Sequence, residues 1–155
     1  MRLRIISLGH KMPAWVDAAC SDFIKRMPRE LSVEMIDIKP EKRAAGNSTD
    51  NIQQIESKRI IEAVGKDYIV ACDERGPEIS TLQLADKLQT WQGLGRDVSI
   101  VIGGADGLHA SIKQRADFLW GLSKLTLPHA FVRVLLCEQL YRAHSVLNNH
   151  PYHRE

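Results

Sequence analysis

Short apolar segments of strand length alternate with longer amphipathic segments along the whole chain. This pattern predicts strands over Leu3–Leu8, Leu31–Ile38, Asp67–Cys72 and Val98–Ile102, and a fifth strand region over Phe118–Leu122 and Leu125–Leu127, interrupted around Ser123. It predicts helices over Ala14–Met27, Asn51–Val64, Ser80–Gln92, Ala110–Arg115 and Pro128–Asn148. Strands that alternate with helices indicate an α/β fold with a largely parallel sheet. A length of 155 residues suits a single domain over residues 1–155.

Composition excludes several classes of protein. The apolar segments are too short for a transmembrane helix, and residues 1–8 resemble a first strand rather than a signal peptide. The three cysteines, Cys20, Cys72 and Cys137, are widely spaced, which favours a reducing cytoplasm over a disulfide framework. Of the six histidines, only His150 and His153 lie close together. Because Pro151 separates them and no second ligand cluster occurs, no metal site is expected.

The strand Val98–Ile102 ends in Gly103, Gly104 and Gly107. This spacing matches neither the dinucleotide fingerprint nor a P-loop, because no P-loop lysine follows. Glycines at a strand end allow close approach to the backbone, which suits the edge of a planar base such as adenine. A tight turn between a strand and a helix explains the same residues. Both interpretations stay open on this motif alone.

Two polar segments are candidates for contact with RNA. The segment Lys39–Asp50 has no large apolar residue and contains three basic side chains, so it is either a solvated loop or a phosphate-contacting one. The last residues, including Tyr152, His153 and Arg154, combine stacking and hydrogen-bonding groups. They are either a frayed end or a recognition element for an RNA base and its phosphate. The net charge of +2 does not decide the matter.

The final helix has apolar residues on more than one side. Val132, Leu136, Leu140, Ala143 and Leu147 share one arc, whereas Phe131, Val134, Leu135 and Cys137 lie outside it. A helix of this kind needs a second apolar partner, so a subunit interface is expected.

Several motifs, in order along the whole chain, carry a resemblance to a known family. They are Lys11-Met12-Pro13-x-Trp15-Val16, Gly95-Arg96-Asp97-Val98-Ser99, Ile102-Gly103-Gly104-x-x-Gly107-Leu108, Leu125-Thr126-Leu127-Pro128-His129, Val132-Arg133-Val134-Leu135 and Asn149-His150-Pro151-Tyr152-His153-Arg154-Glu155. On these residues the sequence resembles the bacterial 23S ribosomal RNA pseudouridine N3-methyltransferases, the RlmH family of the SPOUT class.

The resemblance implies an S-adenosyl-L-methionine-dependent enzyme that methylates N3 of a pseudouridine in 23S rRNA. Because the net charge is only +2, a match in shape to the assembled ribosome is expected rather than general affinity for RNA. The resemblance also implies a parallel-rich sheet flanked by helices, a C-terminal trefoil knot and a homodimer. The implied cofactor-binding residues are Cys72, Gly103, Gly104, Leu122, Ser123, Lys124, Leu125, Thr126 and Leu127. Cys72 stands where leucine is usual in the family.

Methylation of an imide nitrogen requires removal of its proton, stabilisation of the resulting anion and alignment with the methyl donor. His153 is the candidate base, because an imidazole titrates near neutral pH. Arg142 and Arg154 are candidates to balance the anion and phosphate charges. Tyr152 would stack on or hydrogen-bond the target base. Glu138, one helical turn before Arg142, would orient that arginine, although the two could equally form a solvated pair.

Two other functions fit the same sequence. One is a non-catalytic RNA- or ribosome-binding module that uses Lys39, Lys42, Arg43 and the basic tail. The other is a SPOUT methyltransferase that acts on tRNA.

Overall fold

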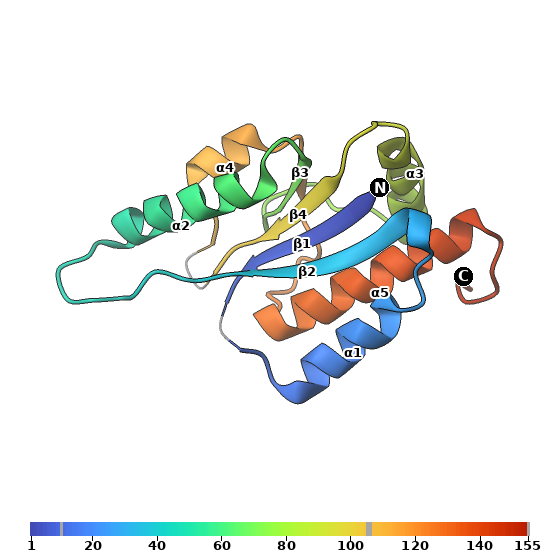
Figure 1. Ribbon diagram of the computed structural model, residues 1–155, viewed down its shortest axis with the longest axis horizontal. Coiled ribbons are helices and arrows are strands. Elements are labelled where there is room, and N and C mark those ends of the chain that lie inside the picture. The colour runs from blue at the N-terminus through green and yellow to red at the C-terminus, as the bar shows by residue number, and fades with distance from the viewer. Residues whose placement is uncertain (10, 105–106, 155) are drawn as a thin grey trace.

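The computed structural model describes residues 1–9, 11–104 and 107–154 and has a five-stranded sheet at its centre (Figure 1). The strand order is β2-β1-β4-β3-β5, and every adjacent pair is parallel. The strands are β1 (Arg2–Leu8), β2 (Ser32–Ile38), β3 (Tyr68–Cys72), β4 (Val98–Ile102) and β5 (Phe118–Trp120). The prediction of an α/β fold with a parallel sheet is confirmed.

Helices cover both faces of the sheet. They are α1 (Ala14–Ile24), α2 (Thr49–Val64), α3 (Thr81–Gln92), α4 (Ala110–Arg115) and α5 (His129–Leu147), and a 3₁₀ turn, η1, spans Arg29–Leu31. Helix α5 packs against α1 and α3 on one face, while α2 and α4 lie on the other (Figure 1). The sheet has a hydrophobic core on each face. Strand β1 contributes Leu3 and Ile5 to the core beneath α5, and Ile6 and Leu8 to the core beneath α2. This alternation follows from the two-residue period of a strand buried on both faces.

Local capping explains most of the observed helix starts. Ser80 accepts a hydrogen bond from the backbone N–H of Gln83, whose side chain accepts one from the N–H of Ser80, so this capping box fixes the start of α3. The Ser48 side chain caps α2 by accepting from the backbone N–H of Asn51, and α2 begins two residues before the predicted Asn51. Helix α1 ends at Ile24, before the predicted Met27.

The prediction that Leu125–Leu127 continues the fifth strand is wrong. Strand β5 ends at Trp120, and the chain leaves the sheet at Gly121. The backbone N–H of Gly121 donates to the carbonyl of Pro77 at 3.0 Å, so the chain pairs with the loop after β3 instead of with a strand. Leu125 then lies 74% exposed at the surface.

The loops after β3 and β5 cross at two glycines. A Cβ atom on Gly121 would overlap the carbonyl oxygen of Gly76, and a Cβ on Gly76 would lie 2.9 Å from the backbone nitrogen of Gly121. Only hydrogen atoms fit between the two chains at this point. The crossing therefore fixes the position of residues 121–128 relative to the end of β3.

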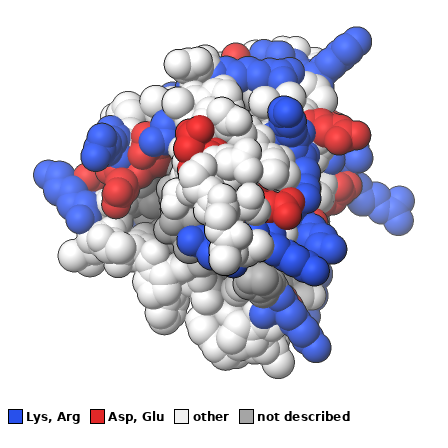
Figure 2. All heavy atoms as spheres, turned by 90° about the vertical axis from the view of Figure 1, so that its left-hand side faces the viewer, with Lys and Arg blue, Asp and Glu red and all other residues white. Residues whose placement is uncertain are grey.

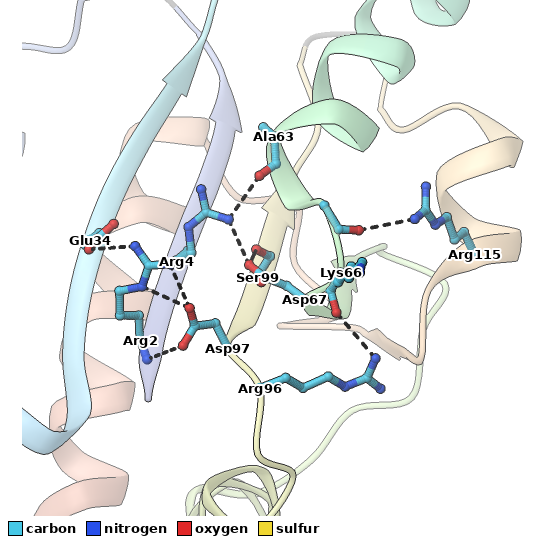
Figure 3. Close-up of polar contacts among 11 residues, drawn as sticks. Arg2, Arg4, Glu34, Ala63, Lys66, Asp67, Arg96, Asp97, Ser99 and Arg115 are labelled. Carbon is cyan, nitrogen blue, oxygen red and sulfur yellow. Dashed lines mark hydrogen bonds and ion pairs between the residues drawn. The ribbon is translucent and has the colours of Figure 1, made fainter.

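The amino ends of the strands are closed by a network of charged groups (Figure 3). The Arg4 guanidinium donates to the Ala63 carbonyl at 3.0 Å and pairs with the Asp67 carboxylate at 2.8 Å, and the Ser99 hydroxyl donates to the same carboxylate at 2.7 Å. Arg2 pairs with Asp97 at 2.8 Å. These contacts tie together the amino ends of β1, β3 and β4.

Replacing Asp67 with alanine is expected to lower the free energy of unfolding by about 3 kcal/mol, because Arg4 is largely buried and would lose its counter-ion. Denaturant unfolding at a fixed protein concentration measures the change. The control is Asp22→Ala, which removes ion pairs to Lys25 and Arg26 on an exposed surface and should cost less than about 1 kcal/mol. Equal losses in the two variants would contradict the assignment.

None of the described helices is long and apolar enough to cross a membrane. Within the same residues, no group of three or more His, Cys, Asp or Glu side chains could hold a metal ion.

Candidate active site

A cavity of about 440 Å³ opens at the carboxyl ends of β3, β4 and β5. We call it the strand-end cavity. Cys72, Ile102 and Trp120, the last residues of these three strands, contribute to its wall. In open parallel sheets, ligands bind outside the carboxyl ends of the strands. Its remaining lining residues are Asp73, Glu74, Arg75, Gly103, Gly107, Leu108, Lys113, Leu122, Ser123, Leu125, Thr126, Leu127 and Val132.

The predicted cofactor-binding residues meet at this cavity, with two exceptions. Cys72, Gly103, Leu122, Ser123, Leu125, Thr126 and Leu127 line it. Gly104 lies instead against a different cavity beside Lys39, and Lys124 lines neither of them. Sequence reasoning missed Asp73, Trp120 and Val132, although Asp73 and Trp120 stand at the strand ends from which the predicted residues come.

Backbone geometry shapes the glycine segment. A Cβ atom on Gly103 would lie 2.7 Å from the carbonyl carbon of Gly107, so no other residue fits there without movement of the backbone. The N–H of Gly107 donates to the carbonyl of Gly104 at 3.0 Å, and Gly107 has a φ of +76°. Gly104 and Gly107 are therefore held close together, and Gly103 and Gly107 line the cavity, while Ala105 and Asp106 lie outside the described residues.

The start of α5 holds this wall through the partly buried His129 and the buried Arg133. The Arg133 Nε donates to His129 Nε2 at 2.9 Å, and its Nη1 pairs with Asp37 at the end of β2 at 2.8 Å. Because His129 Nε2 accepts, its proton lies on Nδ1, and the ring hydrogen-bonds the backbone of Gly103. Burial, together with the nearby Arg133 guanidinium, lowers the pKa of His129. The residues thus form a chain of contacts from β2 to the cavity wall.

Four of the five predicted catalytic residues gather at the other end of α5. Arg142 Nε and Nη2 both lie 2.7 Å from Glu138 Oε1, and the Tyr152 hydroxyl donates to the same oxygen at 3.1 Å. The Arg142 guanidinium lies 4.6 Å from the centre of the Tyr152 ring, and its Nη1 is 3.2 Å from His153 Nδ1. We call Glu138, Arg142, Tyr152 and His153 the tail cluster. Arg154 is exposed and lies outside it.

Each member of the tail cluster has a defined protonation or bonding state. Arg142 only donates hydrogen bonds, so His153 Nδ1 accepts and a neutral His153 carries its proton on Nε2, which is buried without a partner among the described residues. Burial and the Glu138 carboxylate raise the pKa of Tyr152, which therefore remains a phenol. The Glu138 side chain is 19% exposed and accepts a further hydrogen bond from Gln139 at 2.8 Å, so it is partly shielded from solvent.

The tail cluster and the strand-end cavity lie far apart within one chain. Val132 lines the cavity, and Arg142 follows ten residues later on the same helix, which corresponds to about 15 Å along the helix axis. Figure 1 shows the start of α5 near the carboxyl ends of the strands and the C-terminal tail at the opposite end of the molecule. The cluster cannot act at the cavity of its own chain in this arrangement.

The protein-family comparison decides the class of this protein. Residues 1–153 match the model described as "Predicted SPOUT methyltransferase". The chain belongs to the SPOUT methyltransferase family. This SPOUT methyltransferase is 64% identical over 155 residues to the ribosomal RNA large subunit methyltransferase H of Methylobacillus flagellatus, with 100% of both chains covered. It is 52% identical to the protein of the same name from Paraburkholderia phymatum, with 99% of each chain covered.

Solved structures agree on the fold. The tRNA (m1G37) methyltransferase from Aquifex aeolicus aligns with a TM-score of 0.53 at 15% identity, covering 92% of this chain and 70% of that one.

SPOUT methyltransferases use S-adenosyl-L-methionine, and the strand-end cavity has a lining that suits it. Leu122, Leu125 and Leu127 offer apolar surface for an adenine ring, and Gly103 offers close approach to backbone. The carboxylates of Asp73 and Glu74 suit ribose hydroxyls and the positive charge of a sulfonium. Burial raises the pKa of Cys72 to about 12, so its thiol is neutral and serves as a small apolar wall.

Lowering the pH from 7 to 5 is expected to weaken S-adenosyl-L-methionine binding through His129. The neutral ring accepts from Arg133, whereas a protonated ring loses that bond and is repelled by the guanidinium. Its pKa lies below the ordinary value, so binding is at full strength above about pH 6.5 and declines below it. Calorimetric titration across this range measures the dissociation constant. A His129→Gln variant should show a weaker pH dependence, and an unchanged dependence would contradict this role.

Proposed function

We propose that this protein methylates N3 of a pseudouridine in 23S rRNA, with S-adenosyl-L-methionine as methyl donor and the ribosome as substrate. The full-length 64% identity to a ribosomal RNA large subunit methyltransferase H is the observation that carries the substrate. The tail cluster supports the chemistry, because it combines a fixed cation, an imidazole and an aromatic ring. Such a protein works in the cytoplasm, as one domain over residues 1–155.

We also propose that the enzyme is a homodimer in which the tail of one chain completes the strand-end cavity of its partner. The separation of the two halves of the site along α5 is the main support. Trp15 and Phe131 supply apolar surface for such an interface. Their rings lie 5.5 Å apart at the starts of α1 and α5, and they are 50% and 55% exposed. Cys137, which the helical arc placed with Phe131, is buried and is not part of this surface.

A trefoil knot is the proposed topology of the C-terminal part, in which α5 passes through the loop after β3. The close crossing at Gly76 and Gly121 supports it, as does the hydrogen bond from Gly121 to Pro77.

In this mechanism the cofactor, when bound, supplies an activated methyl group on sulfur. Glu138 holds the Arg142 guanidinium in place through two of its nitrogens, so that its remaining Nη1 is directed at the substrate. When a pyrimidine oxygen takes over Nη1, His153 Nδ1 is released and accepts the N3 proton. Arg142 then stabilises the imide anion. The Tyr152 ring, already stacked with Arg142, provides a flat surface for the target base.

Transfer of a radiolabelled methyl group tests the reaction. Ribosomes, free 23S rRNA and tRNA from cells that lack this protein are each incubated with enzyme and labelled S-adenosyl-L-methionine, and the modified nucleotide is located by mass spectrometry. Methyl-pseudouridine in 23S rRNA is the expected product. No transfer to any RNA would favour a binding module, and labelled tRNA would favour the other SPOUT alternative.

Subunit mixing tests the shared site. A chain with Arg142→Ala and a chain with Gly103→Val should each be inactive as homodimers, because one lacks the tail function and the other the cavity. Refolding the two together should restore activity, since the mixed dimer contains one intact cavity facing one intact tail. Failure to restore activity in a demonstrated mixed dimer would contradict action across the interface.

A further inference from the structure

A second cavity, of about 480 Å³, lies beside the glycine segment and has no part in the mechanism above. We call it the loop cavity. Its walls are Leu8 and Gly9 at the end of β1, Lys39–Arg43 after β2, Glu56 of α2, and Gly104. Gly103 lines the strand-end cavity and Gly104 lines the loop cavity. The glycine segment therefore contributes to both cavities.

Helix α2 fixes the backbone of the charged wall. Arg59 Nη1 donates to the Lys39 carbonyl at 2.8 Å, and Arg59 Nη2 pairs with Glu41 Oε2 at 2.6 Å. Glu56, which is 8% exposed, accepts from the backbone N–H of Glu41 at 3.1 Å. These contacts hold Lys39–Glu41 against α2, so the wall has a defined shape before any ligand arrives.

The same contacts leave the cavity with a positive character. The two carboxylates among its described lining residues are engaged, since Glu41 pairs with Arg59 and Glu56 accepts from the backbone N–H of Glu41. Lys39 and Lys42 are exposed and form no ion pair within the described part of the chain. Figure 2 looks at this end of the molecule and shows lysine and arginine side chains around an uncharged centre, with fewer acidic ones among them.

We propose that the loop cavity binds a phosphodiester of the RNA strand close to the nucleotide that is methylated, with Lys39 and Lys42 as the contacts. The proposal rests on the function proposed above. The described lining residues include no aromatic ring on which a base could stack, whereas lysine ammonium groups are compact charges that bind phosphate oxygens. A backbone contact of this kind fixes the register of the strand without reading its sequence. It would place the adjacent base toward the strand-end cavity across the glycine segment.

The test is a double variant, Lys39→Gln with Lys42→Gln, assayed by methyl transfer to ribosomes at several salt concentrations. The KM for ribosomes should rise about tenfold, and the slope of log KM against log salt should fall by about 1.5 to 2. The kcat and the dissociation constant of S-adenosyl-L-methionine should stay unchanged, because neither lysine lines the strand-end cavity. The variant Lys39→Arg with Lys42→Arg keeps both charges and should restore the KM.

The matched control is Lys58→Gln with Lys66→Gln, which removes two exposed lysines outside the loop cavity. An unchanged KM in the Lys39 and Lys42 variant, or an equal rise in the control, would overturn the proposal. Binding of the Lys39 and Lys42 variant to a protein-free rRNA fragment tests whether the partner is an RNA phosphate or a ribosomal protein. If the variant loses affinity only for whole ribosomes, the proposal is overturned as well. If the wild type transfers no methyl group to any RNA, the proposed function fails instead.

Discussion

Replacing Arg142 with alanine is expected to lower the kcat of methyl transfer by about 10²- to 10³-fold, the usual cost of removing one fixed donor from an anionic transition state. The variant removes the group that joins Glu138, Tyr152 and His153 into one cluster. The dissociation constant of S-adenosyl-L-methionine should not change, because Arg142 does not line the cavity of its own chain and the partner's tail is proposed to contact the RNA base rather than the cofactor. Single-turnover transfer to ribosomes, with calorimetric titration of the cofactor, measures both quantities.

Arg26 provides a matched control for this experiment. Its guanidinium lies 5.6 Å from the centre of the Tyr141 ring and pairs with Asp22, but it contacts neither Glu138 nor His153 in any described interaction. Arg26→Ala should therefore leave the kcat nearly unchanged. Arg142→Lys should recover only part of the activity, because an ammonium cannot reproduce the fork that binds Glu138. A normal kcat for Arg142→Ala would show that the anion is stabilised by another group.

Replacing Gly121 with valine is expected to lower the free energy of unfolding by at least about 3 kcal/mol and to abolish cofactor binding. The new side chain would overlap the carbonyl of Gly76, and neither backbone can yield without displacing a wall of the strand-end cavity. Denaturant unfolding and calorimetric titration measure the two effects.

Gly93→Ala is the control for the crossing. Gly93 has a φ of −85°, and a Cβ there would meet only the Thr90 carbonyl at 3.5 Å, an ordinary contact. We expect its stability to change by less than about 1 kcal/mol. If Gly121→Val instead folds with normal stability and binds S-adenosyl-L-methionine, the crossing does not shape the cavity.

The sequence predicted the elements well where a local signal defines them. Strand β4 and helix α4 have the expected bounds, and the Ser80 cap begins α3 as predicted. The strand order was beyond prediction, because it depends on which loops cross the sheet. The error at Leu125–Leu127 has the same origin, since those residues alternate as a strand would but find no strand edge to join.

In the candidate site, too, the contact between residues close in the sequence was predicted and the contact between distant residues was not. Glu138 and Arg142 have a helical spacing, so their contact followed from the sequence. The link from Asp37 through Arg133 and His129 to Gly103 was missed, although His129 and Arg133 have the same four-residue spacing. Asp37, the ion-pair partner of Arg133, stands 96 residues before it in the sequence. Only the packing of α5 on the sheet could therefore reveal this contact.

The tail cluster is held together by contacts within one chain. The Tyr152 ring packs edge-on against Tyr141 with centroids 4.8 Å apart, and its hydroxyl is bound by Glu138. Ordering a free tail would cost about 0.5–1.5 kcal/mol for each immobilised side chain, and contacts within the chain make this cost part of folding. In the proposed dimer, these side chains would reach the partner's cavity already ordered.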